Sequence, residues 1–187
     1  MSGRYSFYQV PAAAQAMLPG QTPEFVPRWN IAPRQQVWML HDSGTGRQWR
    51  QALWGFTPHW SRDLSHVVDH ARSETVAGQD FFAAALAERR AVLPANGFFE
   101  WRGKAGTRKQ PYWLSRPEKL FYMAALWEAY PAAGREYFSV AMLTRPAAYL
   151  RRPLLIAAED LDVWLDPATP RERVLALLAG PAPALQE

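Results

Sequence analysis

One glutamate is a candidate acid or base. Glu100 lies in residues 98–101 (FFEW), a segment that we expect to form a strand. Burial against aromatic rings raises the pKa of a carboxyl group, which would make Glu100 a general acid or base near neutral pH. The alternative is a structural glutamate that pairs with an arginine such as Arg72 or Arg4.

Residue 2 is the second candidate. Ser2 is small, so the preceding Met1 is a good target for removal, and its removal would free the α-amine of Ser2. An α-amine has a pKa near ~8 and can act as a nucleophile. The alternative is an ordinary N-terminal serine without a chemical role.

Two of the four histidines have a spacing that could hold a metal on a helix. His66 and His70 are four residues apart, but residues 67–72 (VVDHAR) favour a strand. In a strand the two rings share a face and lie too far apart to chelate one ion easily, so we expect surface or groove histidines and no metal. No cofactor is expected either, because the glycines at 44–46 and 103–106 fit hairpins and match no phosphate-binding fingerprint.

The chain has no cysteine among its 187 residues. This excludes disulfide scaffolds, cysteine-ligated zinc, iron–sulfur clusters and thiol catalysis. No apolar run approaches the roughly 20 residues that span a bilayer. The N-terminus also lacks the basic and apolar segments that export requires. We therefore expect a cytoplasmic protein without membrane contact.

The basic residues are mostly arginine. Eighteen of the 21 are Arg, the net charge is +4, and residues 76–158 carry twelve basic against six acidic residues. Arg binds phosphate with two parallel hydrogen bonds, and nine Trp offer faces for stacking. Backbone charge and base faces are what any single-stranded nucleic acid presents, so this composition favours such a partner. The alternative is that the Trp fill the core and the Arg are solvated.

Turn residues and hydrophobic patterns predict the elements that would position these residues. Two hairpins are expected, residues 36–41 with 47–54 and residues 97–102 with 110–115, because glycine-bearing turns separate segments rich in β formers. Further strands are predicted at 120–127, 136–144 and 153–157, and helices at 11–18, 76–90, 161–165 and 171–178. No repeat or linker divides the chain. We expect one domain over residues 1–187 of class α+β, with a curved, barrel-like, mainly antiparallel sheet and peripheral helices.

Seven short blocks occur in the order of a known family. They are residues 1–4 (MSGR), 28–33 (RWNIAP), 53–60 (LWGFTPHW), 70–75 (HARSET), 93–101 (LPANGFFEW), 109–112 (KQPY) and 124–127 (AALW). On these blocks the chain resembles the SRAP family, the SOS response-associated peptidase or abasic-site-processing domain. The resemblance implies the fold of that family and a role at single-stranded or abasic-site DNA in the damage response.

The resemblance also implies a reactive site. In this family the second residue is a cysteine. Its amine attacks the aldehyde of an abasic site, and its thiol closes the imine into a stable thiazolidine, with Asn, Glu and His nearby. Glu100 retains the Glu, whereas Ser2 replaces the Cys, His70 replaces the Asn, and Tyr149 stands where the His is expected.

DNA contacts are implied in the same way. Arg4 and Arg72 match positions that hold phosphate in the family, and Trp60 matches the loop residue that packs against the strand break. Asn30 and Pro33 lie in a family block that we expect to contact DNA.

The substitutions change the expected chemistry. A hydroxyl is a much weaker nucleophile than a thiolate, so an imine at Ser2 would rarely be captured as a ring, and any adduct should be reversible. Tyr149, with an ordinary pKa near ~10, is a poor proton shuttle at neutral pH, and His70 is the candidate to compensate. After Gly180 the strand with the family's Val-Ser-x-x-Val pattern is missing, so we expect a shortened C-terminus.

Three functions follow from these observations. We favour a monomer that binds single-stranded or abasic-site DNA and has lost the stable crosslink. The second is an imine-forming lyase or N-terminal self-processing peptidase, with Ser2 as nucleophile and Glu100 as acid or base. The third is a non-catalytic protein-interaction module. Arginines paired with acids would favour this third function, whereas an uninterrupted positive groove would favour DNA.

Overall fold

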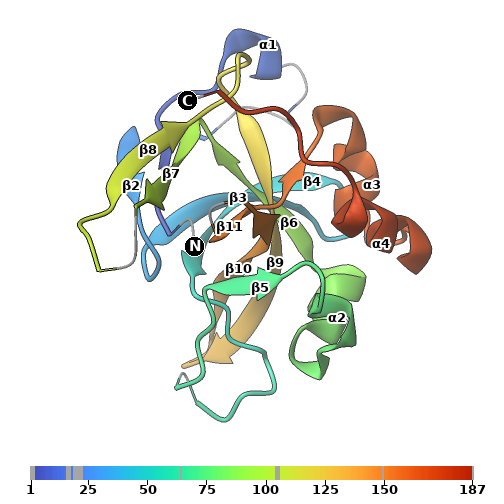
Figure 1. The fold of residues 1–187 in the computed structure, drawn as a ribbon. Helices are drawn as coiled ribbons and strands as arrows, with labels where there is room; N and C mark the ends of the chain where they lie inside the picture. The colour runs from blue at the N-terminus through green and yellow to red at the C-terminus, as the bar shows by residue number, and fades with distance from the viewer. Residues whose placement is uncertain are drawn as a thin grey trace.

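The computed structural model of the chain consists mainly of strands around a closed barrel (Figure 1). It describes residues 3–15, 18, 23–63, 65–103, 106–148 and 150–186. Five strands close the barrel in the order β10, β4, β3, β6, β9 and back to β10. They are β3 (Gln36–Asp42), β4 (Arg47–Trp54), β6 (Arg90–Ala95), β9 (Phe121–Ala132) and β10 (Arg135–Ala147).

Shorter strands extend the barrel at its edges. β5 (His70–Arg72) pairs with β10 in parallel, β11 (Leu150–Pro153) pairs with β10 in antiparallel, and β12 (Leu155–Ile156) pairs with β9. β5 and β11 therefore flank the same part of β10 on its two sides, because Thr144 of β10 is opposite both Arg72 and Pro153.

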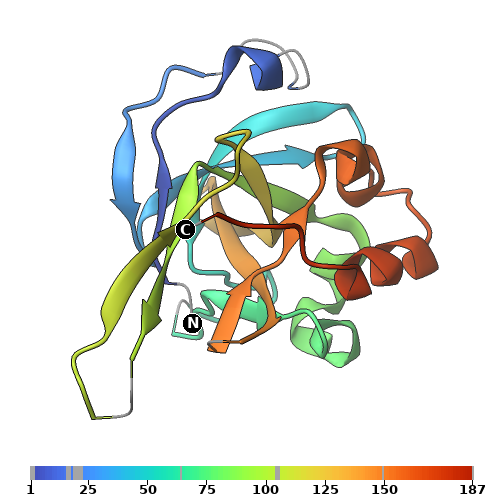
Figure 2. The same ribbon diagram turned by 45° about the horizontal axis from the view of Figure 1, so that its top comes forward.

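A second sheet of four strands stands beside the barrel. Its order is β2 (Arg28–Ile31), β1 (Tyr5–Phe7), β7 (Gly97–Arg102) and β8 (Gln110–Leu114). Figures 1 and 2 show this sheet on one side of the barrel, and the helices α2 (Asp80–Glu88), α3 (Leu161–Leu165) and α4 (Arg171–Ala179) on the other. The predicted class, α+β with a barrel-like, mainly antiparallel sheet and peripheral helices, is confirmed.

Asn96 fixes the point at which the chain passes from the barrel to the second sheet. It lies between β6 and β7 and has no exposed surface. Its Oδ1 accepts the backbone N–H of Tyr8 at 2.7 Å, and its Nδ2 donates to the carbonyls of Gln9 at 2.9 Å and Lys119 at 2.5 Å. A buried amide with these partners holds three segments in one register.

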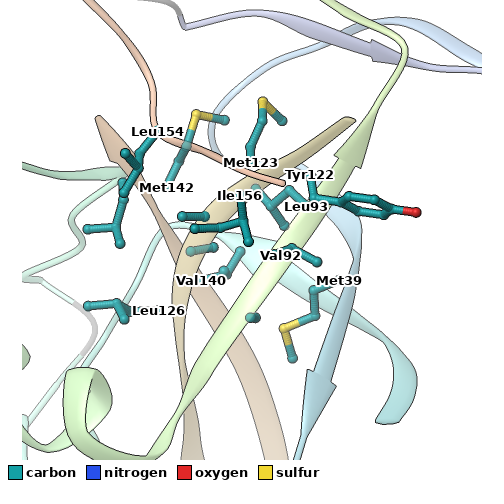
Figure 3. Packing of buried hydrophobic residues seen from close by; sticks show 14 of the residues in the cluster. Met39, Val92, Leu93, Tyr122, Met123, Leu126, Val140, Met142, Leu154 and Ile156 are labelled. Carbon is teal, nitrogen blue, oxygen red and sulfur yellow. The ribbon is translucent and has the colours of Figure 1, made fainter. Parts of the chain in front are cut away.

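The interior of the barrel is apolar. Met39, Leu93, Met123, Val140 and Met142 come from β3, β6, β9 and β10 and are at most 1% exposed. Figure 3 shows their side chains packed together with Leu154 and Ile156. The barrel is therefore a filled scaffold rather than a pore, and a binding site must lie on its surface or at its edges.

The first predicted hairpin is confirmed and its turn explains it. Gly44 and Gly46 adopt positive φ angles of 88° and 106°, which side-chain-bearing residues rarely adopt. Asp42 accepts the N–H groups of both glycines at its Oδ1, at 2.7 and 3.1 Å. The second predicted hairpin is likewise present as β7 and β8.

Other predicted boundaries differ from the structure. The helix expected at 76–90 is a 3-10 turn (Val76–Gly78) followed by α2, and Arg90 begins strand β6. β6 is buried along its whole length, so its sequence shows no alternation and contains Pro94, which argues against a strand. The short strands β1, β2 and β11 were not predicted, and β9 and β10 are longer than expected. α1 (Ala12–Gln15) lies within the predicted helix, whose residues 16 and 17 are outside the described residues.

The C-terminal helices agree with the sequence pattern. α3 has the predicted bounds, and α4 extends one residue beyond them. None of the helices in the described part of the chain is long and apolar enough to cross a membrane.

Candidate functional site

Glu100 lies on β7 and is only 3% exposed. Two guanidinium groups hold its carboxylate. Arg102 donates through Nε to Oε1 at 2.7 Å, and Arg152 of β11 donates through Nε to Oε2 at 2.6 Å and through Nη2 to Oε1 at 3.3 Å. Glu100 therefore joins the four-stranded sheet to the strand at the edge of the barrel.

These contacts correct the sequence-based prediction for Glu100. Burial raises the pKa of its carboxyl group, but hydrogen bonds and charge from Arg152 and Arg102 together outweigh burial, so its pKa lies below the ordinary value. Glu100 is thus ionised at neutral pH and can accept a proton rather than donate one. Its arginine partners are Arg102 and Arg152 instead of the expected Arg72 or Arg4.

Strand β1 brings the beginning of the chain to Glu100. β1 and β7 pair with Tyr5 opposite Phe98, and the N–H of Phe99 donates to the carbonyl of Arg4 at 2.9 Å. Continued two residues before Tyr5, the same register would bring Gly3 to the level of Glu100. Two predicted site residues, Ser2 and Tyr149, lie outside the described residues.

Arg4 and Asn30, two predicted DNA contacts, lie together. The Arg4 side chain is exposed, and its Nη1 donates to Oδ1 of Asn30 on β2 at 2.9 Å. Pro33, in the same predicted set, is half-buried in the turn between β2 and β3, next to Arg34 with its positive φ of 70°. Its role as a DNA contact stays a prediction.

Strand β5 carries two further candidates that the resemblance implied, His70 and Arg72. The His70 ring is half-buried, with its centroid 5.4 Å from that of Trp54. Arg72 is exposed at the end of the strand. Only β10 separates Arg72 from β11, which carries Arg152. Arg72 therefore lies at the same edge of the barrel as Glu100 and its partner Arg152, which we call the Glu100 edge. His66 is exposed in the preceding loop, and within the described residues no group of His, Asp and Glu is arranged to hold a metal.

An ion pair that sequence reasoning missed joins the segment just after β5 to β11. Arg151 donates to both carboxylate oxygens of Glu74 at 2.6 and 2.7 Å, and its Nε donates to Oγ1 of Thr144 at 3.0 Å. Hydrogen bonds from Arg151 lower the pKa of Glu74 to about 2. The signal in the sequence is two adjacent arginines after a strand, but only the fold shows which acid each one meets.

Trp60 lies on a loop that several contacts hold to the barrel. Its side chain is 60% exposed, and its ring meets Phe81 of α2 edge to face, with centroids 5.9 Å apart. The neighbouring His59 shares a hydrogen bond of 2.9 Å with Glu128, a buried carboxylate that also pairs with Arg89 at 3.0 Å. This loop thus presents a tryptophan to solvent on a fixed support.

The exposed aromatic residues extend beyond Trp60. Trp29 is 63% exposed and stacks on Tyr8 at 3.9 Å, and Trp113 is 38% exposed on β8. Trp54, Trp127 and Trp164 are buried in the core. Some tryptophans are therefore available for stacking on bases, as a nucleic-acid partner would require, and others fill the core.

The arginines divide in the same way. Arg34, Arg47, Arg89, Arg102, Arg116, Arg151 and Arg152 all pair with acids. Arg4 and Arg72 are exposed, and neither forms an ion pair with any residue in the described ranges. The edge formed by β1, β5 and β11 can therefore hold anionic groups.

Several known proteins are similar to this chain in sequence. Residues 1–186 match the family described as SOS response associated peptidase (SRAP). The chain is 27% identical over 154 residues to the abasic site processing protein YoqW of Bacillus subtilis, with 77% of this chain and 69% of that protein covered. It is 30% identical over 150 residues to the abasic site processing protein YedK of Escherichia coli, with 76% and 66% covered.

Solved structures have the same fold. A phage-related protein from Bordetella bronchiseptica is 24% identical, with a TM-score of 0.78 over 97% of this chain and 89% of that one. A second protein from the same organism is 21% identical, with a TM-score of 0.80 over 97% of this chain and 95% of that one.

Proposed function

Because the chain belongs to the SOS response associated peptidase (SRAP) family, we propose that it binds single-stranded DNA, and abasic sites within it, as a monomer of one domain. The relatives YoqW and YedK are named abasic site processing proteins. One observation carries the proposal. Arg4, which directly precedes β1, and Arg72 on β5 are exposed near the edge of the barrel at which Glu100 meets Arg152, and neither is neutralised by a described acid.

The electrostatics of this edge suit a phosphodiester backbone. Glu100 would repel phosphate if it stood alone, but Arg102 and Arg152 compensate its charge. Arg4 and Arg72 then remain for phosphate, with which a guanidinium forms two parallel hydrogen bonds. Trp60 offers an exposed ring against which a base can stack.

We do not expect this protein to form the stable crosslink of the family. A thiazolidine requires a thiol next to the reacting amine, and this chain has no cysteine. Any adduct with the aldehyde of an abasic site would remain an imine that water can hydrolyse.

A second candidate function is formation of such an imine by Ser2. It is favoured by the pairing of β1 with β7, which, continued two residues before Tyr5, would bring Gly3 to the level of the ionised Glu100. The free α-amine of Ser2 would add to the aldehyde carbon, and loss of water would give the imine. Glu100 would accept the proton that the nitrogen releases on addition. His70 of β5, whose ring lies near Trp54, is the candidate that would donate a proton to the departing hydroxyl.

Binding and chemistry can be tested in one experiment. The protein is incubated with a single strand that contains one abasic site, and binding is measured in solution at two salt concentrations. Samples with and without borohydride are then analysed on a denaturing gel. We expect salt-sensitive binding in solution, no lasting band without borohydride, and at most a trapped band with it. A band that survives denaturation without borohydride would show that a durable link forms after all.

A matched pair of variants tests the interface. Arg72→Ala should weaken binding and reduce the slope of log K against log salt by about one, because one phosphate contact is lost. Arg173→Ala removes an exposed charge of the same kind from α4 and should change neither. Equal effects of the two variants, or no binding by the unmodified protein, would contradict the proposed DNA function.

A further inference from the structure

A groove lies on the outer face of the barrel, away from Glu100. We call it the tyrosine groove, and it is lined by Gln36, Gln51, Tyr130, Glu136, Tyr137 and Ser139, among others. Its volume is about 770 Å³, within the range of pockets that hold small organic ligands. Its floor is regular, because Leu53 of β4 is opposite both Gln36 of β3 and Ser139 of β10.

Two tyrosines face each other across the β9–β10 pair in this groove. Tyr137 and Tyr130 are register partners, so their side chains are on the same face of the sheet. Tyr137 is 53% exposed, which is unusual for so large a ring on a barrel wall. Gln36 and Gln51 on the adjoining strands are exposed on the same face. Rings beside carboxamides are the groups with which proteins stack nucleobases and hydrogen-bond their edges.

The charges in the tyrosine groove select which part of a nucleotide can enter. None of the described residues that line it is Lys or Arg, and Glu136 is exposed at its wall. The described lining therefore offers a phosphate no cationic partner, whereas an uncharged base needs none. Any strand that uses the groove must turn a base inward and keep its backbone outside.

The groove continues into the loop that carries Trp60. Thr57 lines the groove, and its N–H donates to Oγ of Ser139 at 3.1 Å. Tyr130 also lines it and donates through its hydroxyl to the carbonyl of Ser61 at 3.1 Å. One loop thus presents Trp60 on one side and forms the rim of the groove on the other. Figure 1 shows this loop, which follows β4, beside the lower end of β9 and β10.

We propose that the tyrosine groove is a subsite for one unstacked nucleobase of the DNA strand that passes Trp60, with the base stacked on Tyr137 and its edge bonded by Gln36 or Gln51. This rests on the proposed DNA binding and adds a second point of attachment that reads a base rather than a phosphate. The groove would fix where the strand leaves the Glu100 edge.

The probe is a single strand with one stable abasic analogue and one 2-aminopurine, which is moved to successive positions. We expect its fluorescence to be quenched by the protein at a position set by the distance from the abasic analogue. Tyr137→Ala should restore the fluorescence there and weaken binding roughly fivefold or more, as loss of one base–aromatic stack does. Tyr137→Phe keeps the ring and should behave as the unmodified protein does.

Salt dependence separates this subsite from the phosphate contacts. Tyr137→Ala should leave the slope of log K against log salt unchanged, because no phosphate is released, whereas Arg72→Ala should reduce it. Unchanged affinity and unchanged quenching in Tyr137→Ala would overturn the subsite and leave the proposed function intact, provided that Arg72→Ala still weakens binding. If the unmodified protein binds no single strand, both proposals fail. Because Tyr137 is half exposed, a melting curve should confirm that Tyr137→Ala folds normally.

Discussion

Two buried or paired carboxylates at the Glu100 edge show how neighbours decide what a titratable side chain can do. Glu100 is almost fully buried, which raises the pKa of its carboxyl group, but two guanidinium groups bond its oxygens and lower that pKa by more. Glu74 is less buried, and Arg151 is the one arginine that pairs with it among the described residues, with the Ser73 hydroxyl as a further donor. Both carboxylates at this edge are therefore ionised, and arginines compensate their charge.

His41 presents the opposite case and predicts a pH dependence of stability. It is 2% exposed on β3, its ring packs on Trp127 at 4.7 Å, and within the described ranges neither of its nitrogens has a hydrogen-bond partner. Burial, assisted by the charge of Arg50, lowers the pKa of His41 from 6.5 to about 4. Below pH 6.5 the unfolded chain binds a proton that the folded protein does not, so the free energy of unfolding should fall as the pH decreases toward 4.

The contribution of His41 to stability can be measured between pH 7 and pH 5, a range in which carboxylates titrate little. Between pH 7 and pH 5 the His41 pKa shift should lower the free energy of unfolding by about 2 kcal/mol. Denaturant titrations at the two pH values give the difference, and His41→Leu should remove most of it. The same pH dependence in His41→Leu would mean that other groups cause it.

At the scale of elements, the loop between β4 and β5 depends on a carboxylate of β9. Glu128 is 4% exposed, pairs with Arg89 at the end of α2 and bonds the His59 ring at 2.9 Å. These contacts act together with the Tyr130 hydroxyl, the Thr57 N–H that donates to Ser139, and the Trp60–Phe81 ring contact to hold the exposed stretch around Trp60 against the barrel. The position of Trp60 is therefore set by residues far away in sequence.

Glu128→Gln should loosen this loop while the barrel remains folded. The amide has no charge to compensate Arg89, and it forms weaker hydrogen bonds than the carboxylate does. We expect faster hydrogen exchange in the peptide around residues 57–63 and DNA affinity lower by several-fold. Glu172→Gln, the same change at an exposed position of α4, serves as the control. Unchanged exchange in Glu128→Gln would show that the Glu128 contacts do not hold the loop.

At the scale of the whole molecule, Arg90 joins the helical side to the barrel. It begins β6 and has no exposed surface. Its guanidinium donates to the carbonyl of Leu86 in α2 at 2.8 Å and to that of Trp164 in α3 at 2.7 Å. These carbonyls are at helix ends, where no intrahelical partner exists, so Arg90 satisfies groups that would otherwise be buried without a hydrogen bond.

Arg90→Met should therefore destabilise the fold as a whole. Loss of the guanidinium leaves several buried carbonyls unsatisfied, and we expect a decrease of roughly 3 kcal/mol in the free energy of unfolding, or about 10 °C in Tm. Thermal melting followed by circular dichroism measures it. Arg173→Met, at an exposed position of α4, should melt within about 2 °C of the unmodified protein, since surface changes cost little. A small effect of Arg90→Met would mean that water reaches these carbonyls.

Local signals in the sequence were enough to predict both hairpins, two helices and the family. Glycines that must adopt positive φ marked both hairpins, and helix patterns marked α3 and α4, because these features depend on neighbours in the chain. The ordered blocks around Arg4, Trp60, Arg72 and Glu100 were enough to indicate the family, and the missing cysteine was enough to remove the thiazolidine from the expected chemistry.

Only the tertiary structure decided what those residues meet. β6 was missed because a strand buried on both faces has no alternation, and the helix prediction ran into it. The pKa of Glu100 was predicted in the wrong direction, because its aromatic neighbours in sequence are visible, whereas Arg152 arrives from a strand more than fifty residues later. Side-chain charge is settled by contacts in space, and the pairing of β1, β5, β10 and β11 creates those contacts.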